Sequence, residues 1–263
     1  MTEPNVLIDI SSQGVATLTL NRPHAHNAFD ELLVAALTSA FQQLEENVDV
    51  RCIVLAAQGK SFSVGSDLGW MKRMADYDES QHIADAEALT ELLRTVHECS
   101  KPTIARVQGS VFGAGIGLIA CCDIAVANEH ASFALTEVKL GLIPAVISPY
   151  VIAAMGARQT RRYMLSAERF DAREALRIGL VHKVVGDETL DEWIGRLTRQ
   201  IMANGPYALA ASKELIRTIV SQPLGADVRA DCVRRIVEIR ISDEAQEGLD
   251  AFLSKRKPDW VNE

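Results

Sequence analysis

The chain has 263 residues, of which 48% are hydrophobic and 24% are charged. This is an ordinary globular composition. Against 27 Lys and Arg stand 35 Asp and Glu, and the net charge of −8 argues against non-specific binding to nucleic acid. The five cysteines include no CxxC pair, which argues against a disulfide framework or a zinc site and favours a reducing, cytoplasmic location.

The first half of the chain predicts alternating strands and helices. Apolar residues at helical spacing follow Asp30, a suitable N-cap, and short β-rich runs end at glycine, proline or asparagine. The expected elements are strands at 6–10 and 15–20 joined as a hairpin, a helix at 32–44, a strand at 51–57, a helix at 81–99, a strand at 103–107, a turn at 109–113, a helix at 114–121, and strands at 123–127 and 132–135.

After Pro149 the pattern becomes helical. Helices are expected at 150–155, 157–166, 171–178, 190–203, 206–220, 226–240 and 243–255. Asp171 and Ser242 are suitable N-caps, and Gly179 is a suitable C-terminal glycine. Because no Pro/Gly-rich linker separates the two parts, we expect a core at 1–200 and a helical region at 201–263 that pack as one unit.

The segment 107–127 is apolar and long enough to cross a membrane. It contains Gln108 and Asp123, however, and glycines interrupt it. An aspartate at bilayer depth costs about 2.5–3.5 kcal/mol on insertion scales. We therefore expect no membrane span. The neighbouring Cys121 and Cys122 are interpreted as small core residues.

Two glycine-rich loops, at 59–67 and 108–117, each follow a strand and lead toward a helix. Free backbone N–H groups at helix starts attract negative charge, and two aimed at one point form an oxyanion hole. The second loop lacks the last glycine of a dinucleotide fingerprint, because residue 118 is Leu118. The first lacks the Walker A pattern, because residue 54 is Val54. A nucleotide site is therefore not favoured.

At this point the sequence resembles a known family. The loops SFSVGSDLGWM and VQGSVFGAGIGLIACCDIAVA, followed by SFALTEVKLGLIPA, are similar to those of the crotonase or enoyl-CoA hydratase/isomerase superfamily. The similarity continues through ARQTRRYMLSAERFDAREALRIGLVHKVV to AFLSKRK, so it spans nearly the whole chain. Within the superfamily the pattern looks most like bacterial methylglutaconyl-CoA hydratases.

The resemblance implies an α/β fold, a crotonase-like spiral of β-β-α turns with a C-terminal helical region used for trimerisation. It also implies an acyl-CoA thioester substrate and no separate cofactor, since coenzyme A is part of the substrate. The homotrimer can pair into a dimer of trimers. The family's two oxyanion N–H groups fall on Ser66 and Ala114.

The carboxylates depart from the pattern of two-glutamate hydratases. One glutamate falls on Glu137, in the Glu-x-x-x-Gly-x-x-Pro segment, and apolar neighbours there would raise its pKa, which suits acid–base catalysis. The other falls on Gly117, so this carboxylate is missing. Asp67 and Asp85 are candidate helpers, although a helix N-cap is the more ordinary role for Asp67.

The resemblance also places residues along the substrate. His24 and Ala25 fall beside the adenine, next to Arg22, and Lys60 and Lys255 fall near the CoA phosphates. In the family the second lysine reaches a neighbouring subunit. Further substrate contacts are expected at Val64, Asp67, Leu68, Gly69 and Gly115, and Trp70 and Met71 are candidates for either the acyl pocket or the core. The histidines are scattered, so we expect no metal site.

These features together predict a hydro-lyase that adds water to the 2,3 double bond of an enoyl-CoA, including branched ones. The single Glu137 would both activate the water and deliver the proton. The reaction would belong to fatty acid metabolism or leucine degradation. Two alternatives stay open: a Δ3-Δ2 enoyl-CoA isomerase with Glu137 as the proton shuttle, and an acyl-CoA binder with little turnover.

Overall fold

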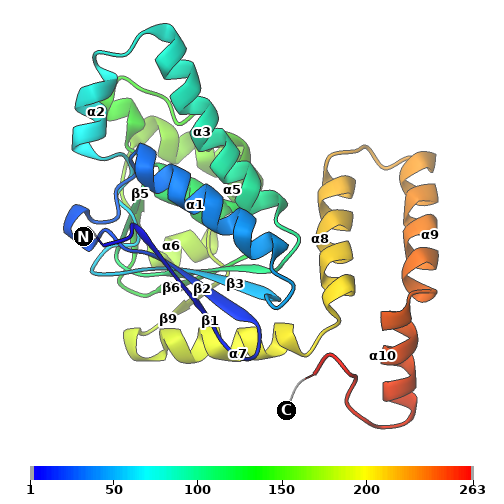
Figure 1. Ribbon diagram of the computed structural model, residues 1–263. Coiled ribbons are helices and arrows are strands. Elements are labelled where there is room, and N and C mark those ends of the chain that lie inside the picture. Colours follow the sequence, from blue (N-terminus) through cyan, green and yellow to red (C-terminus); the bar gives the residue numbers. More distant parts are fainter. Residues whose placement is uncertain (1–2, 262–263) are drawn as a thin grey trace.

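The computed structural model describes residues 3–261 and contains two sheets (Figure 1). The larger sheet has the strand order β1-β2-β3-β4-β6-β9, and the smaller has the order β5-β7-β8. The strands are β1 (Val6–Ile10), β2 (Val15–Leu20), β3 (Cys52–Ala57), β4 (Thr103–Val107), β5 (Ser110–Phe112), β6 (Ile124–Asn128), β7 (Ser132–Ala134), β8 (Phe170–Asp171) and β9 (Lys183–Val185). In the larger sheet β1 and β2 pair antiparallel, and the other neighbours pair parallel.

Helices cover both faces of the larger sheet. In Figure 1, α1 and α3 lie over one face and α7 lies beneath the other. The helices are α1 (Glu31–Glu46), α2 (Leu68–Met74), α3 (Glu79–Glu98), α4 (Ala114–Cys121), α5 (Ser148–Ser166), α6 (Ala172–Arg177), α7 (Leu190–Met202), α8 (Pro206–Val220), α9 (Ala226–Arg240) and α10 (Asp243–Leu253), with short 3-10 turns at Pro23–Ala25, Glu137–Leu140 and Asp187–Thr189.

The burial of each strand follows its place in the sheet. In β2 the side chains of Ala16, Leu18 and Leu20 are fully buried, and their neighbours are only partly covered. Every residue of β3 is buried, as expected for a parallel strand with helices on both faces. Strand β1 is an edge strand and remains mostly exposed.

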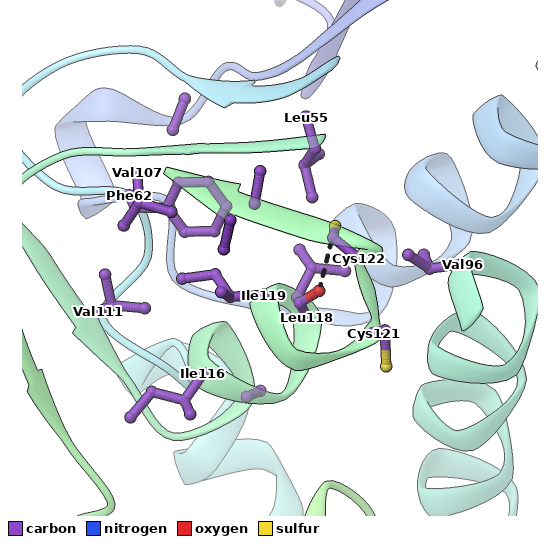
Figure 2. Packing of buried hydrophobic residues seen from close by; sticks show 14 of the residues in the cluster. Leu55, Phe62, Val96, Val107, Val111, Ile116, Leu118, Ile119, Cys121 and Cys122 are labelled. Atoms are coloured by element: carbon purple, nitrogen blue, oxygen red, sulfur yellow. Dashed lines mark hydrogen bonds between the residues drawn. The ribbon is translucent and has the colours of Figure 1, made fainter. Parts of the chain in front are cut away.

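The main core lies between the larger sheet and the helices α1, α3, α4 and α5, and a smaller core lies under α7. Figure 2 shows Ile116, Leu118 and Ile119 of α4 directed into the main core. Cys121 and Cys122 are both buried there, and the Cys122 thiol donates to the Leu118 carbonyl at 3.5 Å. The five cysteines are free, so the interpretation of the vicinal pair as core residues is confirmed.

The predicted hairpin and the helix caps at Asp30, Asp171 and Ser242 are confirmed. The turn expected at 109–113 is wrong in its centre, because Ser110–Phe112 forms β5 and pairs with β7. The break expected between the helices at 150–155 and 157–166 is confirmed, because Gly156 in the middle of α5 has a non-helical backbone with a φ of 74° and kinks the element there. The sequence reading did not include α2, β8 or β9.

The helices α8, α9 and α10 form an arm that stands apart from the rest of the molecule, the body (Figure 1). The arm begins after α7 ends at Met202, so the division expected at residue 200 falls in the last turn of α7. Cationic side chains, chief among them Arg51 and Lys213, tie the arm to the body. Arg51 donates to the carbonyls of Trp260 at 2.6 Å and Asn204 at 2.8 Å, and Lys213 Nζ lies 2.6 Å from Asp123 Oδ2.

No helix within residues 3–261 is both long enough and apolar enough to cross a membrane. The segment 107–127, expected to be a buried strand–turn–helix–strand, consists mostly of β5, α4 and β6, which contribute buried residues to the core, so its burial is confirmed. The cytoplasmic location stays a prediction.

Candidate active site

The two glycine-rich loops lie side by side and are joined by backbone hydrogen bonds. The N–H of Ser63 donates to the Ser110 carbonyl at 3.2 Å, and the N–H of Phe112 donates to the Ser63 carbonyl at 2.9 Å. A Cβ on Gly65, where φ is 88°, would lie 3.3 Å from the Phe112 carbonyl oxygen. The close approach of the loops and the left-handed conformation therefore both favour glycine at this position.

Ser66 and Ala114 each follow a glycine at the point where the loops meet. A Cβ on Gly113 would lie 3.9 Å from the Cα of Gly65. Within residues 3–261 no acceptor takes a hydrogen bond from the backbone N–H of either Ser66 or Ala114. Ala114 is the first residue of α4, where N–H groups have no partner inside the helix. The fold thus brings together two free donors of the kind that an oxyanion hole requires.

Glu137 lies against the same junction. It follows β7 and begins a 3-10 turn, and a Cβ on Gly113 would lie 3.1 Å from its Oε1 atom. Its Oε2 atom is buried and has no hydrogen-bond partner. Burial raises the pKa of the Glu137 carboxyl above its ordinary value, and backbone N–H groups of residues 136 and 137 act weakly in the opposite direction. A carboxylate whose Oε2 is buried without a partner, next to two free N–H donors, is suited to proton transfer.

At residue 117, where the resemblance places a second carboxylate, Ile147 fills the space next to the glycine. A Cβ on Gly117 would lie 2.3 Å from Ile147 Cγ2 and 2.7 Å from Ile147 Cβ. Ile147 is buried and precedes α5, which packs against α4. The space next to Gly117 is therefore filled by an apolar side chain, and a longer side chain at residue 117 has no room.

The two aspartates considered as helpers are committed to other contacts. Asp67 Oδ1 accepts from the N–H groups of Gly69 at 2.8 Å and Trp70 at 3.1 Å, which makes it the N-cap of α2. Asp85 accepts from Trp70 Nε1 at 3.0 Å, in a cleft between α1 and α3 that Glu137 does not line. Trp70 is only 3% exposed and belongs to the core.

Several residues assigned to substrate binding lie close together. The 3-10 turn Pro23–Ala25, which carries His24, lies against the first loop, because a Cβ on Gly59 would be 2.8 Å from Pro23 Cβ. Lys60 follows in that loop and is exposed. The N–H of Val64 donates to the His26 carbonyl at 3.2 Å.

The remaining assigned residues divide between the site and the arm. Leu68 and Gly69 form the start of α2, and Gly115 packs so tightly on the first loop that a Cβ there would lie 2.9 Å from the Ser63 carbonyl oxygen. Lys255 lies beyond the end of α10, on the arm, and the single chain does not bring it to this site (Figure 1). Within residues 3–261 no cluster of three or more His, Cys, Asp or Glu could hold a metal ion.

The sequence reading missed Asn27, which braces the first loop. It is fully buried, and its Nδ2 donates to the carbonyls of Gln58 and Ser61, each at 2.9 Å. Its Oδ1 accepts from the Arg22 N–H at 2.8 Å. The available signal was an asparagine in the short segment between the strand that ends at Leu20 and the N-cap Asp30.

Comparison with known proteins places the chain in a family. Residues 11–263 match the family model described as enoyl-CoA hydratase/isomerase. The crystal structure of an enoyl-CoA hydratase from Shewanella pealeana superposes with a TM-score of 0.95 at 43% identity, covering 97% of this chain and 96% of that one. The 2,3-dehydroadipyl-CoA hydratase of Escherichia coli is 31% identical over 97% of this chain and 98% of its own. The carnitinyl-CoA dehydratase of Salmonella arizonae is 32% identical, covering 94% of each chain.

The chain belongs to the enoyl-CoA hydratase/isomerase family, the crotonase superfamily, and is an enzyme of that family. The predicted fold is confirmed, with its mixed sheets and many helices.

Proposed function

We propose that the enzyme adds water to the 2,3 double bond of an enoyl-CoA thioester, including branched ones. The observation that carries this proposal is the Glu137 carboxylate, whose buried, unpartnered Oε2 lies beside the free N–H groups of Ser66 and Ala114. Two hydratases and a dehydratase of CoA thioesters among the relatives support the same chemistry.

In the proposed reaction Glu137 serves first as base and then as acid. The ionised carboxylate takes a proton from water while the water oxygen forms a bond to C3. The electron pair of the double bond moves toward the thioester, and the resulting oxyanion accepts hydrogen bonds from the N–H groups of Ser66 and Ala114. These donors are fixed by the fold, so they need little reorganisation as the charge develops. Protonated Glu137 then delivers its proton to C2.

Substrate binding is part of the same proposal. The exposed Lys60 and the turn that carries His24 and Ala25 flank the first loop, where the CoA portion would lie. Val64, Asp67, Leu68, Gly69 and Gly115 would surround the acyl end. No separate cofactor enters this scheme. A role in fatty acid or leucine breakdown would follow from the acyl group accepted.

Double-bond isomerisation is the second candidate, and the contact of Gly117 with Ile147 favours it. That contact leaves one carboxylate at the site. One carboxylate suffices to remove a proton from C2 of a 3-enoyl thioester and return it to C4. Hydration remains our first choice because the named relatives are hydratases and a dehydratase.

The test follows the absorbance of the conjugated enoyl thioester. With crotonyl-CoA and with 3-methylglutaconyl-CoA, hydration removes this absorbance, whereas isomerisation of a 3-enoyl-CoA creates it. Glu137→Gln serves as the control for background water addition. Loss of absorbance that depends on Glu137 is the expected result. A Glu137→Gln variant that hydrates at the wild-type rate, or an enzyme that acts on 3-enoyl substrates alone, would contradict the proposal.

We also propose that three chains assemble through the arm, alone or as a dimer of trimers. The arm leaves large apolar side chains exposed, with Val220 at 79%, Phe252 at 79% and Leu253 at 77%. A groove of about 790 Å³ lies between α8, α9 and the body. Assembly would cover this apolar surface and would bring Lys255 to a neighbouring site. Native mass spectrometry should give three or six times the 28.7 kDa chain mass.

A further inference from the structure

Arg22 lies nearly buried between the starts of two helices. Its side chain is 11% exposed, and Nη2 lies 2.8 Å from Asp30 Oδ2 and 3.4 Å from Asp67 Oδ2. Asp30 caps α1, and Asp67 caps α2. Nη1 donates to the Ala28 carbonyl at 2.6 Å. One guanidinium therefore joins two helix caps and the backbone between them.

The backbone segments that this guanidinium joins carry the Ser66 donor. The Phe29 N–H donates to the Gly65 carbonyl at 2.7 Å, and the Asp67 N–H donates to the Phe29 carbonyl at 2.8 Å. Ser66 lies between these two bonds, in a short parallel bridge with Phe29. Arg22 contacts both Ala28, the residue before Phe29, and Asp67, the residue after Ser66.

The charges of Arg22, Asp30 and Asp67 also affect the electrostatic potential at the Ser66 N–H. Asp67 adjoins Ser66 in the chain, so its carboxylate would oppose negative charge developing at the Ser66 N–H. The guanidinium offsets that charge and holds the carboxylate against the start of α2, where Asp67 accepts from Gly69 and Trp70. Without Arg22, two largely covered carboxylates would face each other with no counter-charge.

We propose that Arg22 is a positioning residue, which fixes the Ser66 N–H for the thioester oxygen and neutralises the two aspartates behind it. The inference rests on the proposed function only in assigning the Ser66 N–H to a thioester oxygen. A preorganised donor loses much of its effect when it shifts by a fraction of an ångström. The Arg22 side chain is nearly buried and its guanidinium is engaged by Asp30, Asp67 and the Ala28 carbonyl, which distinguishes it from an exposed cation that would bind the CoA phosphates.

The test uses Arg22→Lys and Arg22→Gln. Lysine keeps the charge and cannot bond both the carboxylates and the Ala28 carbonyl as the guanidinium fork does. Glutamine removes the charge. Arg162→Gln is the matched control, because Arg162 of α5 also faces two carboxylates, Glu168 at 2.7 Å and Glu174 at 3.9 Å, and neither belongs to a glycine-rich loop. Turnover is measured with crotonyl-CoA. The infrared carbonyl band of crotonyl-CoA labelled with ¹³C at C1 is measured in a Glu137→Gln background, which holds the substrate unreacted.

We expect kcat to fall about 10- to 100-fold in Arg22→Gln and less in Arg22→Lys, with KM changed less than about threefold. The carbonyl band of the bound thioester should move toward its position in free solution, and Arg162→Gln should match the parent. If Arg22→Gln does not fold, Arg22→Lys decides alone. An unchanged band and kcat, or a change in KM alone, would overturn the proposal.

The carbonyl band separates the two proposals. It reports polarisation of the thioester whichever reaction follows, so it responds to Arg22 even if the enzyme proves to be an isomerase. Failure of hydration with a band that shifts in the Arg22 variants would contradict the proposed function and support the role of Arg22. Hydration together with a band that does not shift in the Arg22 variants would support the proposed function and contradict the role of Arg22.

Discussion

Ile147 fills the space into which any side chain at Gly117 would project, with its Cγ2 atom 2.3 Å from the position of a Cβ at residue 117. Because both positions are buried, this contact leaves no room for a carboxylate side chain at residue 117. The same contact explains why a glycine occurs at residue 117, inside helix α4.

Gly117→Ala should lower the free energy of unfolding. Alanine gains up to about 1 kcal/mol in helix propensity, but overpacking against a β-branched side chain costs about 1–3 kcal/mol. Ile147→Ala alone should cost about 2–5 kcal/mol. The double variant should be more stable than the sum of the two changes predicts, by about 0.5–3 kcal/mol, because the added methyl group enters the new space. Urea unfolding measures all three.

The control for this cycle is Gly195→Ala in α7. A Cβ there meets only Arg199 Nη1, at 3.4 Å, so the helix propensity should prevail and the variant should be slightly more stable. Equal effects of Gly117→Ala and Gly195→Ala would show that Ile147 does not restrict residue 117.

Glu137→Gln should reduce turnover about 10²- to 10⁴-fold, the usual contribution of a general acid–base group. Because burial raises the pKa of Glu137, the acid limb of the wild-type kcat/KM profile should lie at a higher pH than for an ordinary glutamate. The rate should fall as the pH drops through that raised pKa, since the ionised form starts the reaction. An acid limb at or below the ordinary glutamate value would contradict this assignment.

The same substitution should stabilise the fold at neutral pH. The folded state raises the pKa of Glu137, so its neutral form favours folding, and this contribution is lost as the pH rises through the raised pKa. Glutamine stays neutral and avoids that loss. Urea unfolding should therefore show Glu137→Gln more stable than wild type at pH 7, with the difference disappearing below the ordinary carboxyl pKa. A difference that does not change with pH would point to packing instead.

Lys213→Met should loosen the arm. Lys213 Nζ contacts Asp123 and also donates to the Lys101 carbonyl at 2.8 Å, and the lysine side chain is 16% exposed. Removing it leaves the partly covered carboxylate of Asp123 without its cation, at a cost of roughly 1–3 kcal/mol. The assembly of the variant should therefore be weaker than that of the wild type, and native mass spectrometry should show it dissociating at protein concentrations at which the wild type stays assembled.

Arg234→Met provides the comparison for the arm. Arg234 is an exposed residue of α9 whose ion pairs, with Asp231 and Glu238, stay within that helix. It removes one positive charge from the arm without touching the body, and its effect should be close to zero. If both variants dissociate alike, the loss of charge and not the contact with Asp123 is responsible.

The sequence by itself determined the elements whose information is local. Alternating burial in β2, the cap at Asp30 and the apolar run of α4 follow from side-chain period and capping chemistry, which depend on residues a few positions apart. The glycine loops could be named for the same reason, whereas Glu137 was named through the resemblance of its Glu-x-x-x-Gly-x-x-Pro segment to the family. Strand β5 was read as a turn because three residues between glycines carry too little pattern, and only its partner β7 makes them a strand.

Only the tertiary structure decided what lies opposite each of these residues. Ile147 stands against Gly117, and Arg22 reaches Asp67, although each pair is far apart in the chain. No periodicity encodes such pairs, because they form when separate elements pack into one core. The resemblance to the family marked residue 117 as the position of a second carboxylate, and packing against Ile147 supplied the reason that a carboxylate does not fit there.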